Sequence, residues 1–141
     1  MKAGELSGQC MCGAVAWSYS GSTTRNLVCY CADCRRATGS PLTAFLGCLS
    51  AQLTWTGAIT HYESSPGVQR GFCPVCGTRL YFRSLKWPTE THVHAATMSD
   101  PAAYRPDAQV LMRSRLGWLD QLGTLPAHDG FQREPAATTP Q

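Results

Sequence analysis

The stretch Cys73-Pro74-Val75-Cys76-Gly77 has the spacing of a zinc knuckle, in which two cysteines reach one metal ion from a single tight turn. Gly77 supplies the conformational freedom that such turns commonly need. We call Cys73 and Cys76 the knuckle pair. A structural zinc ion takes four protein ligands. The knuckle pair therefore predicts that further ligands stand elsewhere in the chain.

Other cysteines fall in close clusters nearer the N-terminus. Cys10 and Cys12, the N-terminal pair, are two residues apart. In an extended segment this spacing puts both thiols on one side of the chain, roughly 6 to 7 Å apart. Cys29, Cys31 and Cys34, the trio, offer three thiolates in one short loop. Three ligands with one vacant position are typical of a catalytic zinc ion, whereas four ligands close a structural site.

Spacing alone allows two divisions of these seven cysteines. A plain zinc ribbon would combine Cys31 and Cys34 with the knuckle pair and leave Cys29 and the N-terminal pair as the open set. The alternative combines the two pairs in a structural site and leaves the trio intact as a catalytic site. We favour the second division, because three ligands from one loop preform a site. The eighth cysteine, Cys48, stands alone in an apolar segment, where we expect a strand core position rather than a fourth ligand.

The cysteine content also bears on location. The first residues contain no apolar run long enough for a secretory signal, and no stretch approaches the roughly 18 apolar residues of a membrane span. We therefore expect a cytoplasmic protein without a membrane partner, whose reduced thiols hold metal rather than form disulfides. The formal charge of +3 falls to zero if seven thiolates bind two Zn²⁺ ions. The charge thus gives no support for nucleic-acid binding.

Apolar residues recur mostly with a period of two, as in Val15, Trp17 and Tyr19, which is typical of β-strands. We expect strands over residues 14–19, 42–49, 53–56, 59–63, 68–72, 79–83, 92–97 and 109–112. Helical signals are confined to residues 32–38, which end at Gly39, and residues 101–104. The length fits one domain, placed at residues 1–126 and followed by a partly disordered tail over residues 127–141. We expect a mainly β fold stabilised by zinc.

Three stretches resemble the glutathione-dependent formaldehyde-activating enzyme family, which includes the centromere protein V group. They are residues 8–15 (GQCMCGAV), 29–40 (CYCADCRRATGS) and 64–78 (SSPGVQRGFCPVCGT). The resemblance implies an Mss4-like fold of several coiled antiparallel β-sheets with short helical turns. It also implies a structural zinc ion on the two pairs and a catalytic zinc ion on the trio. The activity implied is that of a carbon–sulfur lyase acting on a glutathione–formaldehyde adduct, S-hydroxymethylglutathione, with glutathione as co-substrate.

Glutathione carries two carboxylates, so its site should present cations and polar donors near the metal. The candidate contacts are Arg35, Arg36, Thr38, Gly39, Ser40, Ser64, Ser65 and Arg70. The arginines also suit a second role, because they offset the negative charge of thiolate-bound zinc.

For other polar residues near the cysteines, a structural role is an alternative to a functional one. Asp33 is expected to cap the short helix that follows it rather than accept a proton. His92 and His94 alternate and are expected to form a polar strand face. Tyr30 and His61 are possible proton shuttles that spacing does not assign.

Two functions remain open on the sequence. The first is a zinc-dependent carbon–sulfur lyase that takes a small thiol and an aldehyde, because the trio offers an open metal position. The alternative is a non-catalytic zinc module that binds a protein or a small ligand. A fourth ligand closing the trio, such as Cys48, would favour the alternative. Methionine sulfoxide reduction is disfavoured, because no cysteine follows Cys76 to act as the nucleophile.

Overall fold

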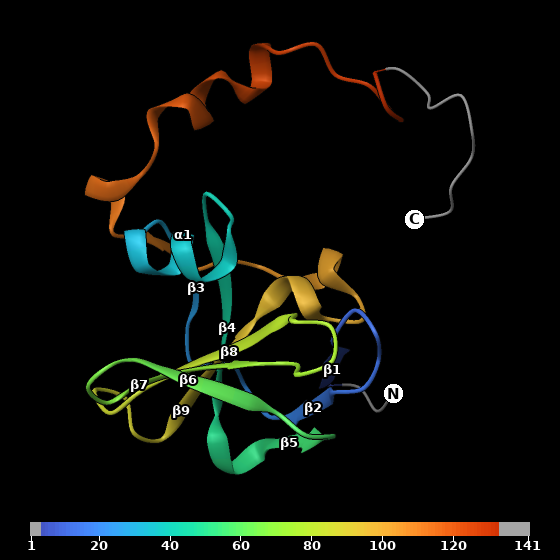
Figure 1. Ribbon diagram of the computed structural model, residues 1–141, viewed down its shortest axis with the longest axis vertical. Helices are drawn as coiled ribbons and strands as arrows, with labels where there is room; N and C mark the ends of the chain where they lie inside the picture. Colours follow the sequence, from blue (N-terminus) through green and yellow to red (C-terminus); the bar gives the residue numbers. More distant parts are fainter. Residues whose placement is uncertain (1–3, 133–141) are drawn as a thin grey trace.

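A computed structural model describes residues 4–132 of the chain and shows a mainly β protein (Figure 1). The strands are β1 (Glu5–Gln9), β2 (Ala16–Ser20), β3 (Asn26–Cys29), β4 (Thr43–Leu49), β5 (Leu53–Thr56), β6 (Thr60–Ser65), β7 (Val68–Phe72), β8 (Arg79–Ser84), β9 (Glu90–His94) and β10 (Ala108–Val110). The helices are α1 (Ala32–Thr38) and the 3-10 turns η1 (Ser50–Gln52), η2 (Ala95–Thr97), η3 (Pro101–Ala103), η4 (Met112–Ser114) and η5 (Gly117–Thr124).

The strands form two sheets. The smaller has the order β1-β2-β5, and the larger has the order β10-β3-β4-β9-β8-β7-β6. Neighbouring strands are antiparallel except β10, which pairs in parallel with β3. The expected fold of antiparallel sheets with short helical turns is therefore confirmed. None of the helices within residues 4–132 has the length and apolar character needed to cross a membrane.

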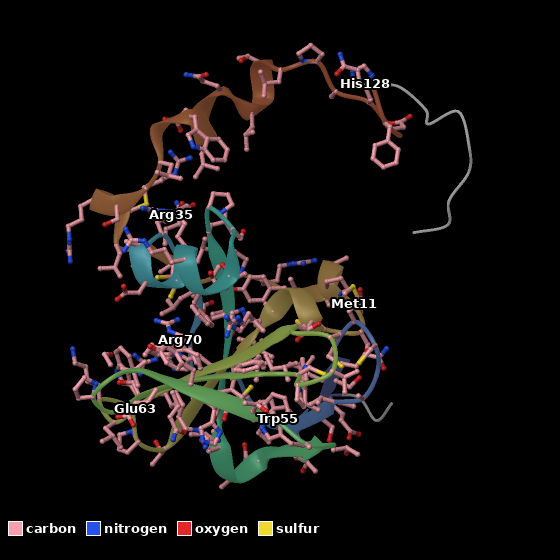
Figure 2. All side chains as sticks on the ribbon, viewed as in Figure 1. Met11, Arg35, Trp55, Glu63, Arg70 and His128 are labelled. Carbon is pink, nitrogen blue, oxygen red and sulfur yellow. The ribbon has the colours of Figure 1, made fainter. Side chains whose placement is uncertain are left out.

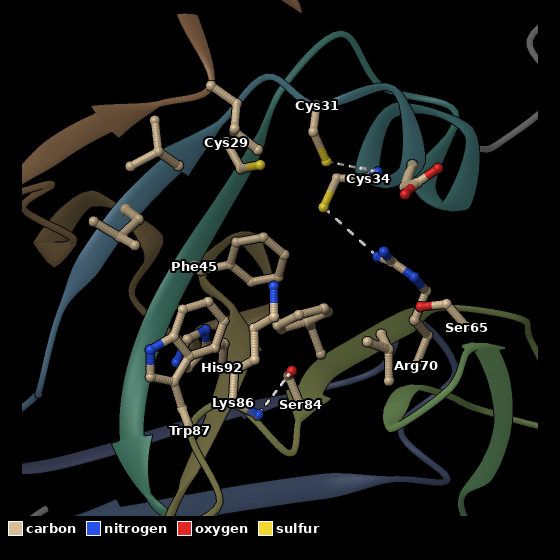
Figure 3. A pocket seen from close by; sticks show the side chains of 16 residues that line it. Cys29, Cys31, Cys34, Phe45, Ser65, Arg70, Ser84, Lys86, Trp87 and His92 are labelled. Carbon is tan, nitrogen blue, oxygen red and sulfur yellow. Dashed lines mark hydrogen bonds between the residues drawn. The ribbon is translucent and has the colours of Figure 1, made fainter.

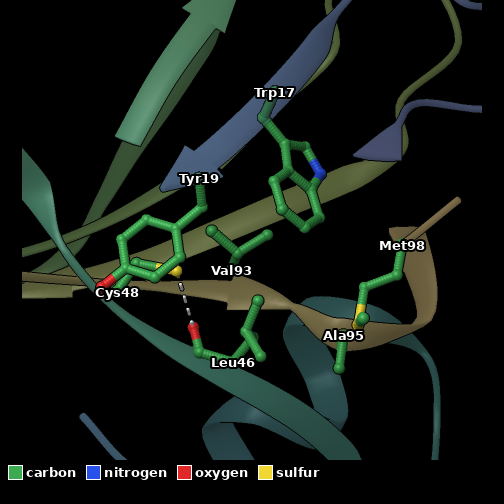
Figure 4. Close-up of a cluster of buried hydrophobic side chains, with 7 residues drawn as sticks. All are labelled: Trp17, Tyr19, Leu46, Cys48, Val93, Ala95 and Met98. Carbon is green, nitrogen blue, oxygen red and sulfur yellow. Dashed lines mark hydrogen bonds between the residues drawn. The ribbon is translucent and has the colours of Figure 1, made fainter. Parts of the chain in front are cut away.

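The main core lies between the two sheets. Leu46 and Cys48 of β4 and Val93 of β9 share one face of the larger sheet, since alternate strand residues point the same way. They pack against Trp17 and Tyr19 of β2, as Figure 4 shows. The Cys48 side chain is fully buried, and its thiol donates to the Leu46 carbonyl over 3.7 Å. Cys48 is thus a core residue, as expected.

The alternating residues of the same strands lie on the opposite face of the larger sheet. Phe45 of β4 packs there against His92 and His94 of β9, with ring centroids 6.2 and 5.1 Å apart. The two histidines share a strand face, as expected, but aromatic rings pack on this face, so the expectation that it is polar is wrong. Helix α1 lies over this second face (Figure 1), and the space between them holds the site described below.

Helix α1 has the bounds that the sequence predicts. It ends where Gly39 adopts a φ of 66°, a left-handed conformation that L side chains rarely adopt, and the Gly39 N–H donates to the Arg35 carbonyl over 2.8 Å. Six predicted strands, over residues 14–19, 42–49, 53–56, 59–63, 68–72 and 79–83, match β2 and β4 to β8, with ends that move by two residues or fewer.

Two predicted strands run too far. The strand predicted over residues 92–97 ends at His94, because the Thr97 hydroxyl donates to the His94 carbonyl over 2.8 Å and starts a 3-10 turn. The strand predicted over residues 109–112 ends at Val110, because Leu111 turns the chain with a positive φ of 58°. Strands β1 and β3 were not predicted. Of the predicted disordered tail, residues 133–141 lie outside the described residues.

Candidate metal centre and substrate pocket

The N-terminal pair and the knuckle pair meet in space although 61 positions separate Cys12 from Cys73. Their four Sγ atoms lie within 4.8 Å of one another. The Sγ atom of Cys12 is 3.6 Å from that of Cys10 and 3.8 Å from that of Cys73. The structure therefore brings the N-terminal pair and the knuckle pair together, as in the division that we favoured, and it keeps the trio apart from these two pairs.

Both pairs sit in tight turns of one kind. The N–H of Gly13 donates to the Cys10 carbonyl over 3.1 Å, and the N–H of Gly77 donates to the Cys73 carbonyl over 2.9 Å. The two glycines have φ values of 78° and 77°, which only glycine adopts at little cost. The role that the sequence suggested for Gly77 is confirmed, and Gly13 repeats it.

Polar groups around the two pairs favour deprotonated sulfur. The Val15 N–H donates to the Sγ atom of Cys10 over 3.2 Å. The hydroxyl of Thr78 lies 3.1 Å from the Sγ atom of Cys76 and accepts from the Met11 N–H over 3.0 Å. The hydrogen bond from Thr78 lowers the pKa of Cys76 to about 5. These donors favour the thiolate forms of Cys10 and Cys76, which are the forms that bind a metal cation.

The trio is assembled where β3 runs into α1. Cys29 ends β3, Cys31 is the N-cap of α1, and Cys34 lies in its first turn, with all three Sγ atoms within 4.8 Å. The Sγ atom of Cys31 accepts from the Cys34 N–H over 3.2 Å. The expectation that Asp33 caps this helix is therefore wrong, because the sulfur one residue before the helix has taken that place. Asp33 is exposed and lines the pocket.

Both groups of sulfurs fit a zinc ion. In the trio, a hydrogen bond from the Cys34 thiol to the Cys29 thiolate lowers the pKa of Cys29 and raises that of Cys34, so the two sulfurs do not lose their protons together. A thiophilic dication removes this conflict by binding deprotonated sulfur. Within residues 4–132, no fourth cysteine, histidine, aspartate or glutamate completes the group around the trio. An ion held there retains a position for a ligand from outside.

The trio borders a pocket of about 320 Å³ on the second face of the larger sheet (Figure 3). One side of the pocket, the polar half, carries Ser65 of β6, Arg70 of β7 and Ser84 of β8. Strand register explains this set: Val68 stands opposite both Ser65 and Ser84, and Arg70 lies two residues along the same strand. Side chains from three neighbouring strands therefore point into one space.

The other side, the apolar half, lies across the sheet toward β10. It carries Leu27 of β3, Phe45 of β4, Val110 of β10 and Leu111 just beyond β10. Leu27 stands opposite Phe45 in the ladder, and Val110 stands opposite Cys29. The trio lies between the two halves, with Cys29 adjoining the apolar half.

Arg70 adjoins Cys34 in the polar half. Its Nη1 atom lies 3.6 Å from the Sγ atom of Cys34, and its Nε atom donates to the Ser64 hydroxyl over 2.9 Å. The guanidinium also stacks over the Phe82 ring, 5.3 Å from its centroid. With 8% of its surface exposed, this buried cation is held rigidly beside the trio. Ser64 does not line the pocket itself but hydrogen-bonds to Arg70, which does.

The remaining predicted glutathione contacts lie on α1 or at its end and do not line the pocket: Arg35, Arg36, Thr38, Gly39 and Ser40. Arg35 faces the C-terminal segment in Figure 2, and its Nη1 atom donates to the Ser114 carbonyl over 3.0 Å. Thr38 donates to the Cys34 carbonyl over 2.8 Å and so closes the helix. Contact of these five residues with glutathione stays a prediction.

The two possible proton shuttles lie away from the pocket wall. Tyr30 is buried, and its hydroxyl donates to Gln109 over 2.7 Å while the Arg115 guanidinium stacks on its ring. These contacts hold β10 and the segment after it against the residue that follows β3. His61 is an exposed residue of β6.

Sequence reasoning missed several residues of the pocket. Phe82 and His92 line its floor, and Lys86 and Trp87 reach it from the turn between β8 and β9. Burial lowers the pKa of His92, so its ring is neutral near pH 7 despite the Glu90 carboxylate 2.9 Å away. The alternation of Phe82 with Ser84 indicates that the two side chains share one face of a strand. Only the order of the strands in the sheet shows that this face borders the pocket.

Comparisons with known proteins agree with this geometry. A family model described as glutathione-dependent formaldehyde-activating enzyme matches residues 5–114. An uncharacterized lyase of Schizosaccharomyces pombe is 32% identical over 78 residues, which cover 55% of this chain and 57% of that protein. The chain thus spans little more than half the length of this curated relative.

A solved structure supports the fold. The crystal structure of a Rhodobacter sphaeroides protein has a TM-score of 0.59 and 23% identity, over 74% of this chain and 99% of that one. The family match covers every strand that the structure describes and every cysteine, and it confirms the resemblance together with the expected Mss4-like fold. The chain therefore belongs to the glutathione-dependent formaldehyde-activating enzyme family.

Proposed function

We propose that the protein is a zinc-dependent carbon–sulfur lyase that acts on S-hydroxymethylglutathione or a related thiol adduct. The observation that carries the proposal is the trio of sulfurs at the border of a pocket, without a fourth ligand among residues 4–132. Family membership supports a glutathione-related lyase. We assign one zinc ion to the two pairs and a second to the trio.

The reaction joins a thiol to an aldehyde. A carbon–sulfur bond forms between the thiol sulfur and the carbonyl carbon, and the carbonyl oxygen takes the proton that the thiol gives up; cleavage reverses each change. Zinc bound to thiolates supplies an open position that favours deprotonated sulfur. The chain contributes the placement of the substrate, since Arg70 and the trio fix where charge and sulfur meet.

The charges of the pocket suit a dicarboxylate thiol. Arg70 and Lys86 both line it, and Asp33 is the one acidic residue among its described lining. We assign Arg70 to a carboxylate of glutathione, because a guanidinium offers several donors in a fixed plane. Ser65 and Ser84 add hydroxyl groups on the same side. The proposed small-molecule partners are thus glutathione and an aldehyde.

The alternative of a non-catalytic zinc module gains no support from the site. The residue that would have closed the trio, Cys48, is turned into the core between the sheets. A cytoplasmic location belongs to the proposal as well, because reduced thiols are required at both groups.

The activity is tested by exchange NMR with zinc-loaded protein, glutathione and ¹³C-formaldehyde. We expect catalysed exchange between free and glutathione-bound formaldehyde, and its loss in Cys31→Ser. The control is Cys48→Ala, which removes a cysteine outside both groups. Exchange at the uncatalysed rate with protein that carries two zinc ions would refute the proposal.

A further inference from the structure

The glutathione adduct of formaldehyde carries no apolar group on its reacting carbon that could contact the apolar half of the pocket. Leu27, Phe45, Val110 and Leu111 face it from three strands and the turn after them. A hydroxymethyl group brings one carbon to the metal site and leaves this half of a 320 Å³ space without apolar contact. An apolar pocket lining next to a reacting group is the usual means of selecting an apolar substituent.

The polar half fixes which way the substrate lies. Arg70 adjoins Cys34 on the β7 side of the trio, whereas Cys29 adjoins Val110 on the β10 side. A glutathione moiety whose carboxylates meet Arg70 therefore extends from the trio toward β6 to β8. The carbon attached to its sulfur is left to extend the opposite way, over Phe45 and toward β10. Figure 3 shows Arg70 and Phe45 on opposite sides of this space.

The backbone at Leu111 supports this division. Leu111 has φ 58° and ψ 41°, and it is the one residue other than glycine with positive φ among residues 4–132. This conformation is strained for a leucine and relaxed for a glycine. The strain places an aliphatic side chain at the pocket edge, and strained residues of this kind gather at ligand sites.

We infer that the preferred substrate is the glutathione adduct of a hydrophobic aldehyde, with an alkyl or aryl group on the reacting carbon. This inference rests on the proposed function. Glutathione sulfur bonds to the aldehyde carbon, the carbonyl oxygen takes the thiol proton, and the aldehyde substituent lies in the apolar half. The reaction is neither an oxidation nor a reduction, and it needs no further reactant.

The first test measures binding without turnover. Zinc-loaded protein is titrated calorimetrically with S-methylglutathione and with S-benzylglutathione, which are stable thioethers that differ in the group meant for the apolar half. Each buried methylene contributes about fourfold in affinity, so we expect S-benzylglutathione to bind at least about tenfold more tightly. Equal affinities would overturn the inference.

A matched pair of variants locates the effect. Leu111 and Leu49 are both 37% exposed, but Leu49 does not line the pocket. Leu111→Ala is expected to reduce the preference for the benzyl group severalfold, whereas Leu49→Ala is expected to leave it unchanged. An unchanged preference in Leu111→Ala, or the same loss in both variants, would overturn the assignment of the apolar half.

Exchange NMR with formaldehyde and with benzaldehyde separates this inference from the proposed function. Faster catalysed exchange with benzaldehyde supports both. Catalysis of formaldehyde exchange alone, with equal binding of the two thioethers, overturns the inference and leaves the lyase activity. Tight binding of S-benzylglutathione without catalysis of either aldehyde overturns the lyase activity and supports the apolar half as a binding site.

Discussion

Replacing Cys73 by serine is expected to unfold the chain, whereas replacing Cys31 by serine is expected to cost one metal ion and leave the fold intact. Cys73 is fully buried among apolar side chains that include Val15 and Leu80. Structural zinc supplies roughly 10–16 kcal/mol in small zinc domains, which matches or exceeds the total stability of about 5–15 kcal/mol of an ordinary domain. Losing that ion removes the margin of stability.

Cys31 differs in its surroundings. Its side chain is half-buried at the entry to α1, where its Sγ atom caps the helix. Serine is itself a favoured N-cap, so Cys31→Ser retains a capping bond worth about 1 kcal/mol. The substitution therefore removes a metal ligand and little else. The two variants are expected to differ in stability by on the order of 10 kcal/mol.

Elemental analysis of the purified proteins gives the zinc content, and circular dichroism gives the thermal transition. The wild type is expected to hold two zinc ions and Cys31→Ser one, with a transition within a few degrees of the wild type. Cys73→Ser is expected to show no cooperative transition. Cys48→Ala, which loses a cysteine from the core, controls for cysteine removal and keeps both ions. Equal loss of fold in Cys31→Ser and Cys73→Ser would refute the division of the two sites.

Three further predictions concern single side chains. Arg70→Met is expected to lower the zinc affinity of the trio about 10- to 100-fold, measured by chelator competition. The control is Arg105→Met, at an exposed arginine bonded to nearby carbonyls, which is expected to leave that affinity unchanged. Burial lowers the pKa of His94 from 6.5 to about 4. Between these two pH values the unfolded chain binds a proton that the folded chain does not bind, so stability falls as the pH drops through this range. His94→Gln should make that fall in melting temperature shallower, and an unaltered slope contradicts the assignment. Leu111→Gly should be about 1 kcal/mol more stable than Leu111→Ala in denaturant titrations, because both remove the side chain and only glycine relieves the positive φ; equal stabilities would show that the turn holds no strain.

The sequence predicted the elements whose residues carry their own local signals. Helix α1 was placed correctly because a cysteine cluster precedes it and Gly39 ends it. Strand β1 was missed because its residues, Glu5–Gln9, show no apolar alternation. It forms a strand because β2 pairs with it and because Gly8 lets the Trp17 ring lie close against its backbone. Such a strand depends on its neighbours and leaves little trace in its own residues.

The residues of the candidate site likewise divide into those that a local sequence pattern predicted and those that it did not. The trio and the knuckle pair were readable because each lies within a few residues of chain. The pocket wall was not, since Phe45, Phe82 and Val110 come from strands whose order in the sheet no local pattern fixes. The capping role predicted for Asp33 was wrong because the Sγ atom of Cys31, two residues earlier, accepts the hydrogen bond at the helix start.

The meeting of Cys12 and Cys73 also has a topological consequence. An ion shared by these residues ties the chain into a closed loop, and the trio lies entirely inside that loop. Counted like a disulfide across 61 positions, the tie removes about 4 kcal/mol of chain entropy from the unfolded state. A metal ion on the two pairs would therefore act as a reversible cross-link that limits the conformations of the unfolded chain around the trio. Metal supply to the first site would set how quickly the second can form.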